Sequence, residues 1–123
     1  MTLSRTEEQL MEILWQLERA FMRDLLNAFD DPKPAASTIA TFLKRMTEKG
    51  FVGYKEYGKI REYYPLVGKG EYFSKQVNSM IKNFFNDSPA QFASFFTKQS
   101  NMSAAELENL RAIIDTEIQN KKQ

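Results

Sequence analysis

The chain has 123 residues, of which 42% are hydrophobic, and a formal net charge of +1, so we expect one folded domain or a small domain with an appended helical part. It contains no cysteine and no histidine, which excludes disulfides, thiolate chemistry, imidazole catalysis and nearly every zinc site; we expect no metal and no cofactor. No apolar run approaches the roughly 20 residues of a membrane-spanning helix, and the N-terminus lacks a secretory pattern, so we expect a cytoplasmic protein without membrane insertion.

The first 50 residues predict three short amphipathic helices. Apolar residues spaced three and four apart predict a helix over about 4–18, and Ser4 with Glu7 has the form of a capping box at its start. The same spacing predicts a second helix that ends near Phe29, before two prolines, and a third over about 37–49. Together these helices can share one core.

A basic hairpin is predicted directly after the third helix. Residues 51–64 form two runs of aromatic and β-branched residues around Gly58, which favours a tight turn of type II′. In this register two opposite-charge pairs face each other across the strands. The pairs are Glu56 with Arg61 and Lys55 with Glu62.

Positive charge is concentrated on this helix and hairpin. Residues 33–69 hold eight basic and three acidic side chains, whereas residues 1–32 hold seven acidic and three basic ones. A helix that presents short polar side chains and arginine fits the major groove of DNA, and a neighbouring basic hairpin can reach phosphates. We therefore expect residues 1–69 to form a DNA-binding domain.

Candidate DNA contacts follow from this placement. Thr38 and Thr41 are expected to contact bases, Lys44 a phosphate, and Arg45 either of the two. The hairpin cations Lys55, Lys59 and Arg61 have an alternative role as solubilising charges on edge strands. Arg5 is equally compatible with phosphate contact and with simple solvation. The full set is Arg5, Ser37, Thr38, Thr41, Lys44, Arg45, Lys55, Lys59 and Arg61.

The C-terminal part, residues 70–123, predicts three further helices after a hinge at 68–70. A second capping box, Ser103 with Glu106, places the start of the last helix at Ala104. This part carries many large apolar side chains but is too short to bury them alone, so we expect a homodimer. The predicted dimerisation residues are Phe73, Val77, Met80, Phe84, Phe92, Phe95, Phe96, Leu107, Leu110 and Ile114.

With these elements in order, the chain resembles the penicillinase-repressor (BlaI/MecI/CopY) family of bacterial transcription factors over nearly its whole length. The resemblance rests on LSRTE at 3–7 before ILW at 13–15, on STIATFLKRM at 37–46, and on YYPLV at 63–67. It implies a mainly α winged helix-turn-helix fold with a small β-hairpin and a C-terminal helical dimerisation region. It also implies a repressor that binds a palindromic double-stranded DNA operator as a homodimer.

The resemblance further implies control by a membrane sensor that triggers cleavage in the C-terminal region. In the antibiotic-resistance members the cut lies between an Asn and a Phe; Phe96 matches the second position, and Phe95 stands where the Asn would be. The copper-responsive branch uses C-terminal Cys-x-Cys pairs, which this chain lacks. The operator, the regulated genes and the inducing signal cannot be read from the sequence.

Two other classes of function remain as alternatives. A winged helix can serve only protein recognition, with its aromatic wing against another polypeptide, and such an interface would respond weakly to salt. An enzyme is not expected, because the chain offers neither a glycine-rich phosphate loop nor an activated nucleophile, although a Mg²⁺-dependent nuclease using acidic residues stays formally open.

Overall fold

The computed structural model describes residues 3–123, which form two compact units. The first unit extends to Gln76 and the second runs from Val77 to Gln123. The division falls inside helix α4 (Lys69–Phe84), so the first turns of this helix belong to the N-terminal unit.

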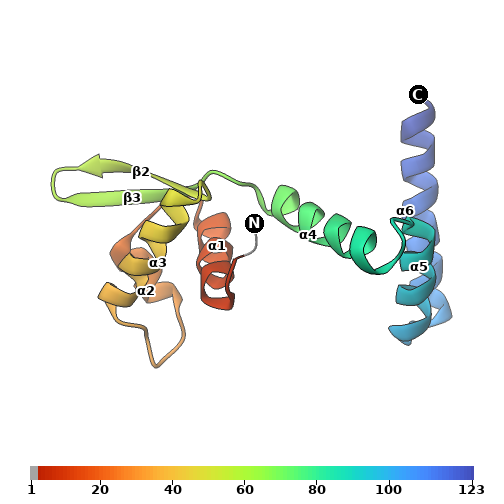
Figure 1. Ribbon diagram of the computed structural model, residues 1–123, viewed down its shortest axis with the longest axis horizontal. Coiled ribbons are helices and arrows are strands. Elements are labelled where there is room, and N and C mark those ends of the chain that lie inside the picture. The colour runs from red at the N-terminus through yellow and green to blue at the C-terminus, as the bar shows by residue number, and fades with distance from the viewer. Residues whose placement is uncertain (1–2) are drawn as a thin grey trace. The chain divides into compact units, whose positions relative to one another are not determined.

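Three helices of the N-terminal unit, whose arrangement Figure 1 shows, pack around one hydrophobic core. They are α1 (Arg5–Leu17), α2 (Met22–Ala28) and α3 (Ala36–Glu48), and they confirm the three predicted segments. Apolar residues three and four apart lie on one face of a helix, and this face is the one that each helix buries. Leu17 departs from the predicted stripe, because as the last residue of α1 it is exposed. The largest fully buried side chains are Leu10, Met11, Leu14, Leu25, Ile39, Leu43, Met46 and Val52.

The hairpin has the predicted register. It consists of β2 (Val52–Tyr57) and β3 (Ile60–Pro65), and it projects beyond the helices (Figure 1). Gly58 has a φ of 63°, which the first position of a type II′ turn requires. The two predicted opposite-charge pairs face each other, Glu56 with Arg61 and Lys55 with Glu62.

A third strand, β1 (Ala20–Phe21), was not predicted. It pairs antiparallel with β3, Ala20 with Tyr63 and Phe21 with Glu62, so the sheet order is β1-β3-β2. Two residues are too few to show the alternation by which strands are recognised in a sequence. The predicted two-stranded hairpin therefore forms two of the three strands of a sheet.

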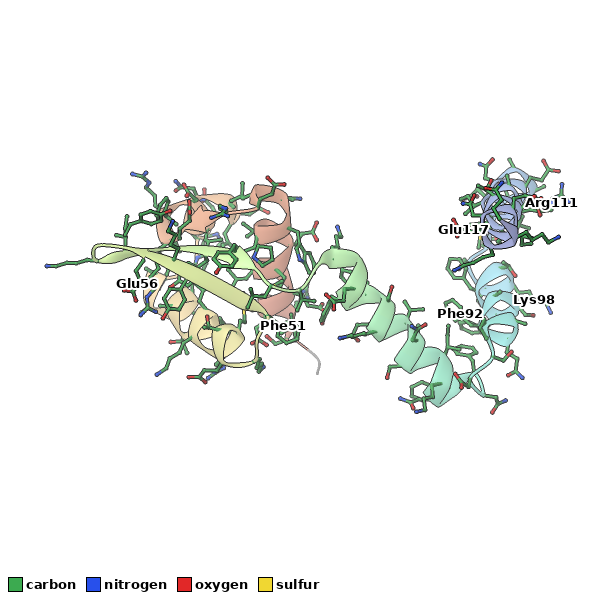
Figure 2. All side chains as sticks on the ribbon, turned by 90° about the horizontal axis from the view of Figure 1, so that it is seen from above. Phe51, Glu56, Phe92, Lys98, Arg111 and Glu117 are labelled. Atoms are coloured by element: carbon green, nitrogen blue, oxygen red, sulfur yellow. The ribbon has the colours of Figure 1, made fainter. Side chains whose placement is uncertain are left out.

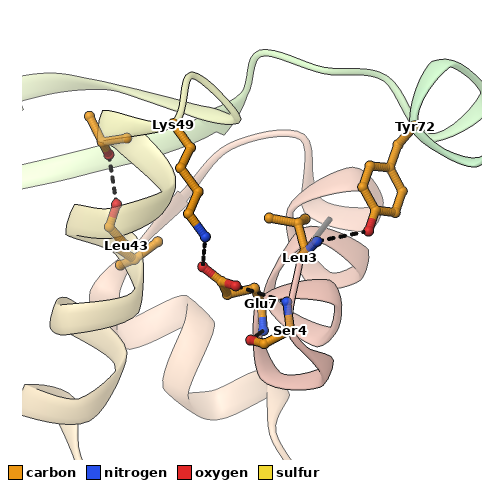
Figure 3. Close-up of polar contacts among 7 residues, drawn as sticks. Leu3, Ser4, Glu7, Leu43, Lys49 and Tyr72 are labelled. Carbon is orange, nitrogen blue, oxygen red and sulfur yellow. Dashed lines mark hydrogen bonds and ion pairs between the residues drawn. The ribbon is translucent and has the colours of Figure 1, made fainter. Parts of the chain in front are cut away.

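A buried carboxylate ties the start of α1 to the end of α3 (Figure 3). Glu7 is 3% exposed; its Oε1 accepts the Ser4 N–H at 2.8 Å, and its Oε2 lies 3.4 Å from the Lys49 Nζ. The Ser4 hydroxyl accepts the Glu7 N–H at 3.3 Å, so the predicted capping box is confirmed. Burial raises the pKa of Glu7, but the Ser4 hydrogen bonds and Lys49 outweigh it, and the pKa lies below its ordinary value of 4.5.

Polar contacts anchor the first turns of α4 on α1. The Tyr72 hydroxyl donates to Glu8 Oε2 at 2.7 Å and accepts the Leu3 N–H at 3.3 Å. Burial and the adjoining Glu8 carboxylate together raise the pKa of Tyr72. One turn earlier, Lys69 Nζ lies 3.0 Å from Glu12 Oε1. The N-terminal unit thus includes the beginning of α4 as a fixed part.

The segment before α4 is also held by Trp15. Its indole N–H donates to the Val67 carbonyl at 2.8 Å, and its ring centre lies 5.8 Å from that of Phe73. Trp15 is half-buried and packs against the hydrophobic core. The predicted hinge at 68–70 needs correction, because α4 already begins at Lys69, and only one residue separates it from the anchored Val67.

The C-terminal unit contains the rest of α4 with α5 (Pro89–Gln99) and α6 (Ala104–Lys122), which starts where the second capping box predicts. Four phenylalanine rings meet between the end of α4 and α5, with centres 5.2 to 6.0 Å apart in the pairs Phe85–Phe92, Phe85–Phe95 and Phe92–Phe96. Figure 2 shows Phe92 and Lys98 on different sides of α5. Within residues 3–123, no helix is both long and apolar enough to cross a membrane.

Candidate nucleic-acid interface

The outward face of α3 carries the polar side chains predicted to contact nucleic acid. Ser37, Thr38, Thr41, Lys44 and Arg45 are all exposed. The apolar residues of α3 that alternate with them are buried against α1, α2 and the sheet. The helix therefore presents one continuous polar face to solvent while its other face fixes it in the core.

Two side chains on this face have a local partner. Thr41 Oγ1 donates to the Ser37 carbonyl at 3.0 Å, which leaves its methyl group and acceptor capacity for another molecule. The Arg45 guanidinium lies 5.8 Å from the centre of the Phe42 ring, within the range of a cation–π contact. A threonine methyl can contact thymine, and an arginine can bond guanine or a phosphate.

The hairpin adds three exposed cations, Lys55, Lys59 and Arg61. Arg61 makes two contacts: its guanidinium lies 4.2 Å from the centre of the Tyr54 ring and 3.8 Å from Glu56 Oε1. Lys55 makes one, with its Nζ 5.3 Å from the centre of the Tyr57 ring. Such contacts reduce the rotamer freedom that the side chain would lose on binding. Arg61 therefore loses less conformational entropy on binding a partner than Lys59 at the tip of the turn.

A cleft of about 530 Å³ lies between α3 and the hairpin and joins the two parts of the interface. It brings Lys44 of α3 and Arg61 of β3 to one opening, so a single phosphate could contact both. Glu48 also lines the cleft and offsets part of its positive charge. The complete lining is Ala40, Lys44, Thr47, Glu48, Tyr54, Arg61 and Tyr63.

Arg5 is the one predicted contact outside this arrangement. It is the exposed first residue of α1 and does not line the cleft. Within residues 3–123 it forms no ion pair, so its position is compatible with a phosphate contact at the N-terminus of α1 as well as with solvation.

Sequence reasoning missed Tyr54 and the Glu7–Lys49 pair. Tyr54 faces Tyr63 in the hairpin register, so Arg61, two residues from Tyr63, is its diagonal neighbour on the same face of the sheet. The predicted register therefore contained the signal for this contact. No sequence pattern pairs Glu7 with Lys49, since the two lie 42 positions apart.

The predicted dimerisation residues are largely exposed in the single chain. Phe84 is 79% exposed, Phe95 51% and Ile114 56%, and Phe73, Val77, Met80, Phe96 and Leu107 are also exposed. Phe92 and Leu110 are half-buried. Ile113 and Ile118 extend the same apolar surface of α6, which we call the α6 patch together with Leu107 and Ile114.

The fold is a winged helix-turn-helix. Its helices α2 and α3 are followed by a hairpin that carries basic residues beside α3. The sequence model of the family described as "Penicillinase repressor" matches residues 3–116. The chain therefore belongs to the penicillinase repressor family, which is a family of regulatory repressors.

Two related sequences agree with this assignment. The methicillin resistance regulatory protein MecI of Staphylococcus aureus strain N315 is 26% identical over 114 residues, which are 92% of this chain and 93% of that protein. The penicillinase repressor of Bacillus licheniformis is 20% identical over 122 residues, 98% of this chain and 95% of that protein. Among solved structures, a mutant of MarR from E. coli aligns with 94% of this chain and 78% of that chain, with a TM-score of 0.48 and 12% identity.

Proposed function

We propose that this protein is a sequence-specific DNA-binding transcriptional repressor that acts as a homodimer on a palindromic operator. The observation that carries the proposal is the exposed polar face of α3 beside a cationic hairpin, on a helix whose other face is locked in the core. The names of the relatives, a penicillinase repressor and a methicillin resistance regulatory protein, support a role in repression.

In this proposal α3 enters the major groove. Thr38 and Thr41 contact base edges, Arg45 contacts a base or a phosphate, and Lys44 grips the backbone together with Arg61 across the cleft. Residues 1–69 make the DNA contacts, and residues 70–123 hold the two copies together so that two α3 helices reach successive half-sites.

Dimerisation through the C-terminal part would cover the apolar side chains that the single chain exposes. The α6 patch and the rings of Phe84 and Phe95 are too extensive for a solvated surface of so small a unit. A two-fold contact of these surfaces would remove them from water, and it would link the binding of two half-sites.

Release from DNA is proposed to follow cleavage or loosening of the C-terminal part, triggered by a membrane sensor system. The Phe95–Phe96 bond lies within α5 and next to the cluster of phenylalanine rings. Because a protease needs an extended segment, cleavage at this bond would require α5 to unfold locally first.

The reading role of α3 is tested by the double variant Thr41→Ala/Arg45→Ala. It should lose most of the preference for operator over random DNA in a gel-shift competition, because two of the three side chains proposed to contact bases are gone. Arg111→Gln, an exposed change on α6, is the control and should keep the preference. An unchanged ratio in the double variant would remove α3 from the reading role.

The dimer interface is tested in the full chain by Ile114→Asp, which places a charge in the α6 patch. The variant should be monomeric by light scattering at concentrations where the wild type is dimeric. Thr116→Asp, on the same helix but outside the patch, should remain dimeric. A dimeric Ile114→Asp variant would contradict the proposed interface.

One observation favours a second function, that of a protein-interaction module. The hairpin tip exposes apolar surface, with Tyr57 44% and Ile60 57% exposed, which DNA phosphates do not need. A partner protein that covers this tip would bind through apolar contacts and with little dependence on salt. The salt dependence of duplex binding therefore separates the two functions.

A further inference from the structure

The space beside the hairpin, on the side away from β2, is a second cavity of the N-terminal unit. Its volume is about 740 Å³, within the usual size range of small-molecule sites. It is lined by Phe21, Met22, Arg23, Lys59, Ile60, Arg61 and Tyr63.

The brevity of β1 explains why this cavity exists. The pairing of β1 with β3 stops at Phe21 opposite Glu62, and the chain then turns away into α2 at Met22. Across residues 3–123 no strand covers the remaining edge of β3 at Ile60, so the first turn of α2 and the hairpin tip enclose an open space.

The cavity lining combines apolar and aromatic side chains with cations. Phe21, Met22, Ile60 and Tyr63 supply the apolar surface, and Tyr63 is nearly buried. No carboxylate lines the cavity in the described part of the chain.

The three cations of the lining differ in the contacts that they make. Arg61 contacts the Tyr54 ring and Glu56 and is the proposed phosphate contact of the cleft beside α3. Arg23 and Lys59 form no ion pair within residues 3–123 and come from two different elements, α2 and the hairpin turn. An apolar body with one carboxylate would fill the space and pair with these two charges at once.

We propose that this cavity binds a small amphipathic carboxylate, with its apolar part against Phe21 and Ile60 and its carboxylate between Arg23 and Lys59. Lys59 is also a proposed contact of the DNA backbone. The ligand would therefore compete with DNA for this charge and lower operator affinity, a consequence that rests on the proposed function. By linkage, operator DNA would lower the affinity for the ligand by the same factor.

Sodium 2-naphthoate is a suitable probe, and its neutral amide, 2-naphthamide, is the matched control. In a titration of the full-length protein without DNA, followed by backbone amide NMR, the naphthoate should bind saturably and shift the signals of Phe21, Met22 and Ile60. The amide should bind more weakly. Absence of saturable shifts, or equal binding of the amide, would overturn the proposal.

Variants test whether Arg23 pairs with the carboxylate of the ligand. Arg23→Gln should weaken naphthoate binding up to about fivefold, as expected for a solvent-exposed charge contact, whereas Arg111→Gln should leave it unchanged. Ile60→Glu, at an exposed position, should abolish binding by placing a carboxylate in the cavity. Equal affinities of Arg23→Gln and Arg111→Gln would refute the proposed site.

A second titration includes the operator duplex. Naphthoate should lower the duplex affinity of the wild type, and less so that of Arg23→Gln. If naphthoate binds at the predicted signals but no duplex binds in its absence, the cavity stands and the repressor function fails. If the duplex binds but naphthoate causes no shifts, the repressor function stands and the cavity proposal fails.

Discussion

Replacing Glu7 should destabilise the N-terminal unit through two separate interactions. In Glu7→Ala the Ser4 N–H loses its acceptor at 2.8 Å, and the Lys49 ammonium loses its partner at 3.4 Å. A hydrogen bond to a charged group contributes about 1.5 to 3 kcal/mol. The Lys49 side chain is 32% exposed, so its share is reduced by solvent to about 0.5 to 1 kcal/mol. We expect a total loss of about 2 to 4 kcal/mol in the free energy of unfolding.

Glu7→Gln separates the two interactions. The amide oxygen can still accept the Ser4 N–H, so this variant keeps the capping box and loses only the charge. We expect it to cost about 1 kcal/mol at neutral pH, measured by urea unfolding followed by circular dichroism. Lys49→Met completes a double-mutant cycle, whose coupling energy should be about 0.5 to 1 kcal/mol.

The sign of the pH effect is fixed by the lowered pKa of Glu7. A carboxyl group whose pKa is lower in the folded than in the unfolded state stabilises the fold fully above its unfolded pKa, near 4.5. This stabilisation is lost as the pH falls through the folded pKa. The difference between wild type and Glu7→Gln should therefore shrink as the pH falls below about 4.5. A difference that is constant over this range, or absent at pH 7, would refute the assigned role of the charge.

Two further changes test the packing of the N-terminal unit. Gly53→Ala should lower the free energy of unfolding by about 1 kcal/mol, because the added Cβ would lie 2.8 Å from the Tyr64 ring. In a Tyr64→Ala background the same change should carry no cost, and a persistent cost would point to another cause. Trp15→Phe should lower the free energy of unfolding by about 1 to 3 kcal/mol, because it leaves the Val67 carbonyl without its donor at 2.8 Å. Thermal unfolding of the variant measures this loss, and an unchanged midpoint would show that water replaces the indole.

Local patterns predicted the parts of the fold that depend on local physics. Both capping boxes are confirmed, because Ser4 with Glu7 and Ser103 with Glu106 meet within one helical turn. The hairpin register is confirmed as well, because a two-residue turn at Gly58 fixes which residues face each other.

Contacts between distant segments could not be predicted in the same way. Strand β1 exists only because Ala20 and Phe21 pair with β3, some 40 residues later. Tyr72 is held by α1, so the anchored start of α4 replaces the expected hinge, although two glycines flank Lys69. Such features depend on which surfaces meet in the folded chain, and a single sequence gives no spacing rule for them.

In the candidate interface too, local features were predicted and contacts between distant segments were not. The exposure of Thr38 and Arg45 followed from helical spacing, since the core residues fix which face points outward. The meeting of Lys44 with Arg61 in one cleft depends on how the hairpin lies beside α3, which the sequence does not state.

The salt dependence of duplex binding tests the central claim most directly. If Lys44 and Arg61 of each protomer share one phosphate, and Lys55 and Lys59 each contact another, a dimer neutralises about six phosphates, and log K should fall with log salt concentration with a slope of about −5. Lys59→Gln should reduce the magnitude of this slope by about 2, whereas the control Arg111→Gln should leave it unchanged. A slope near zero, or an equal slope in Lys59→Gln, would contradict the assignment of this surface to DNA.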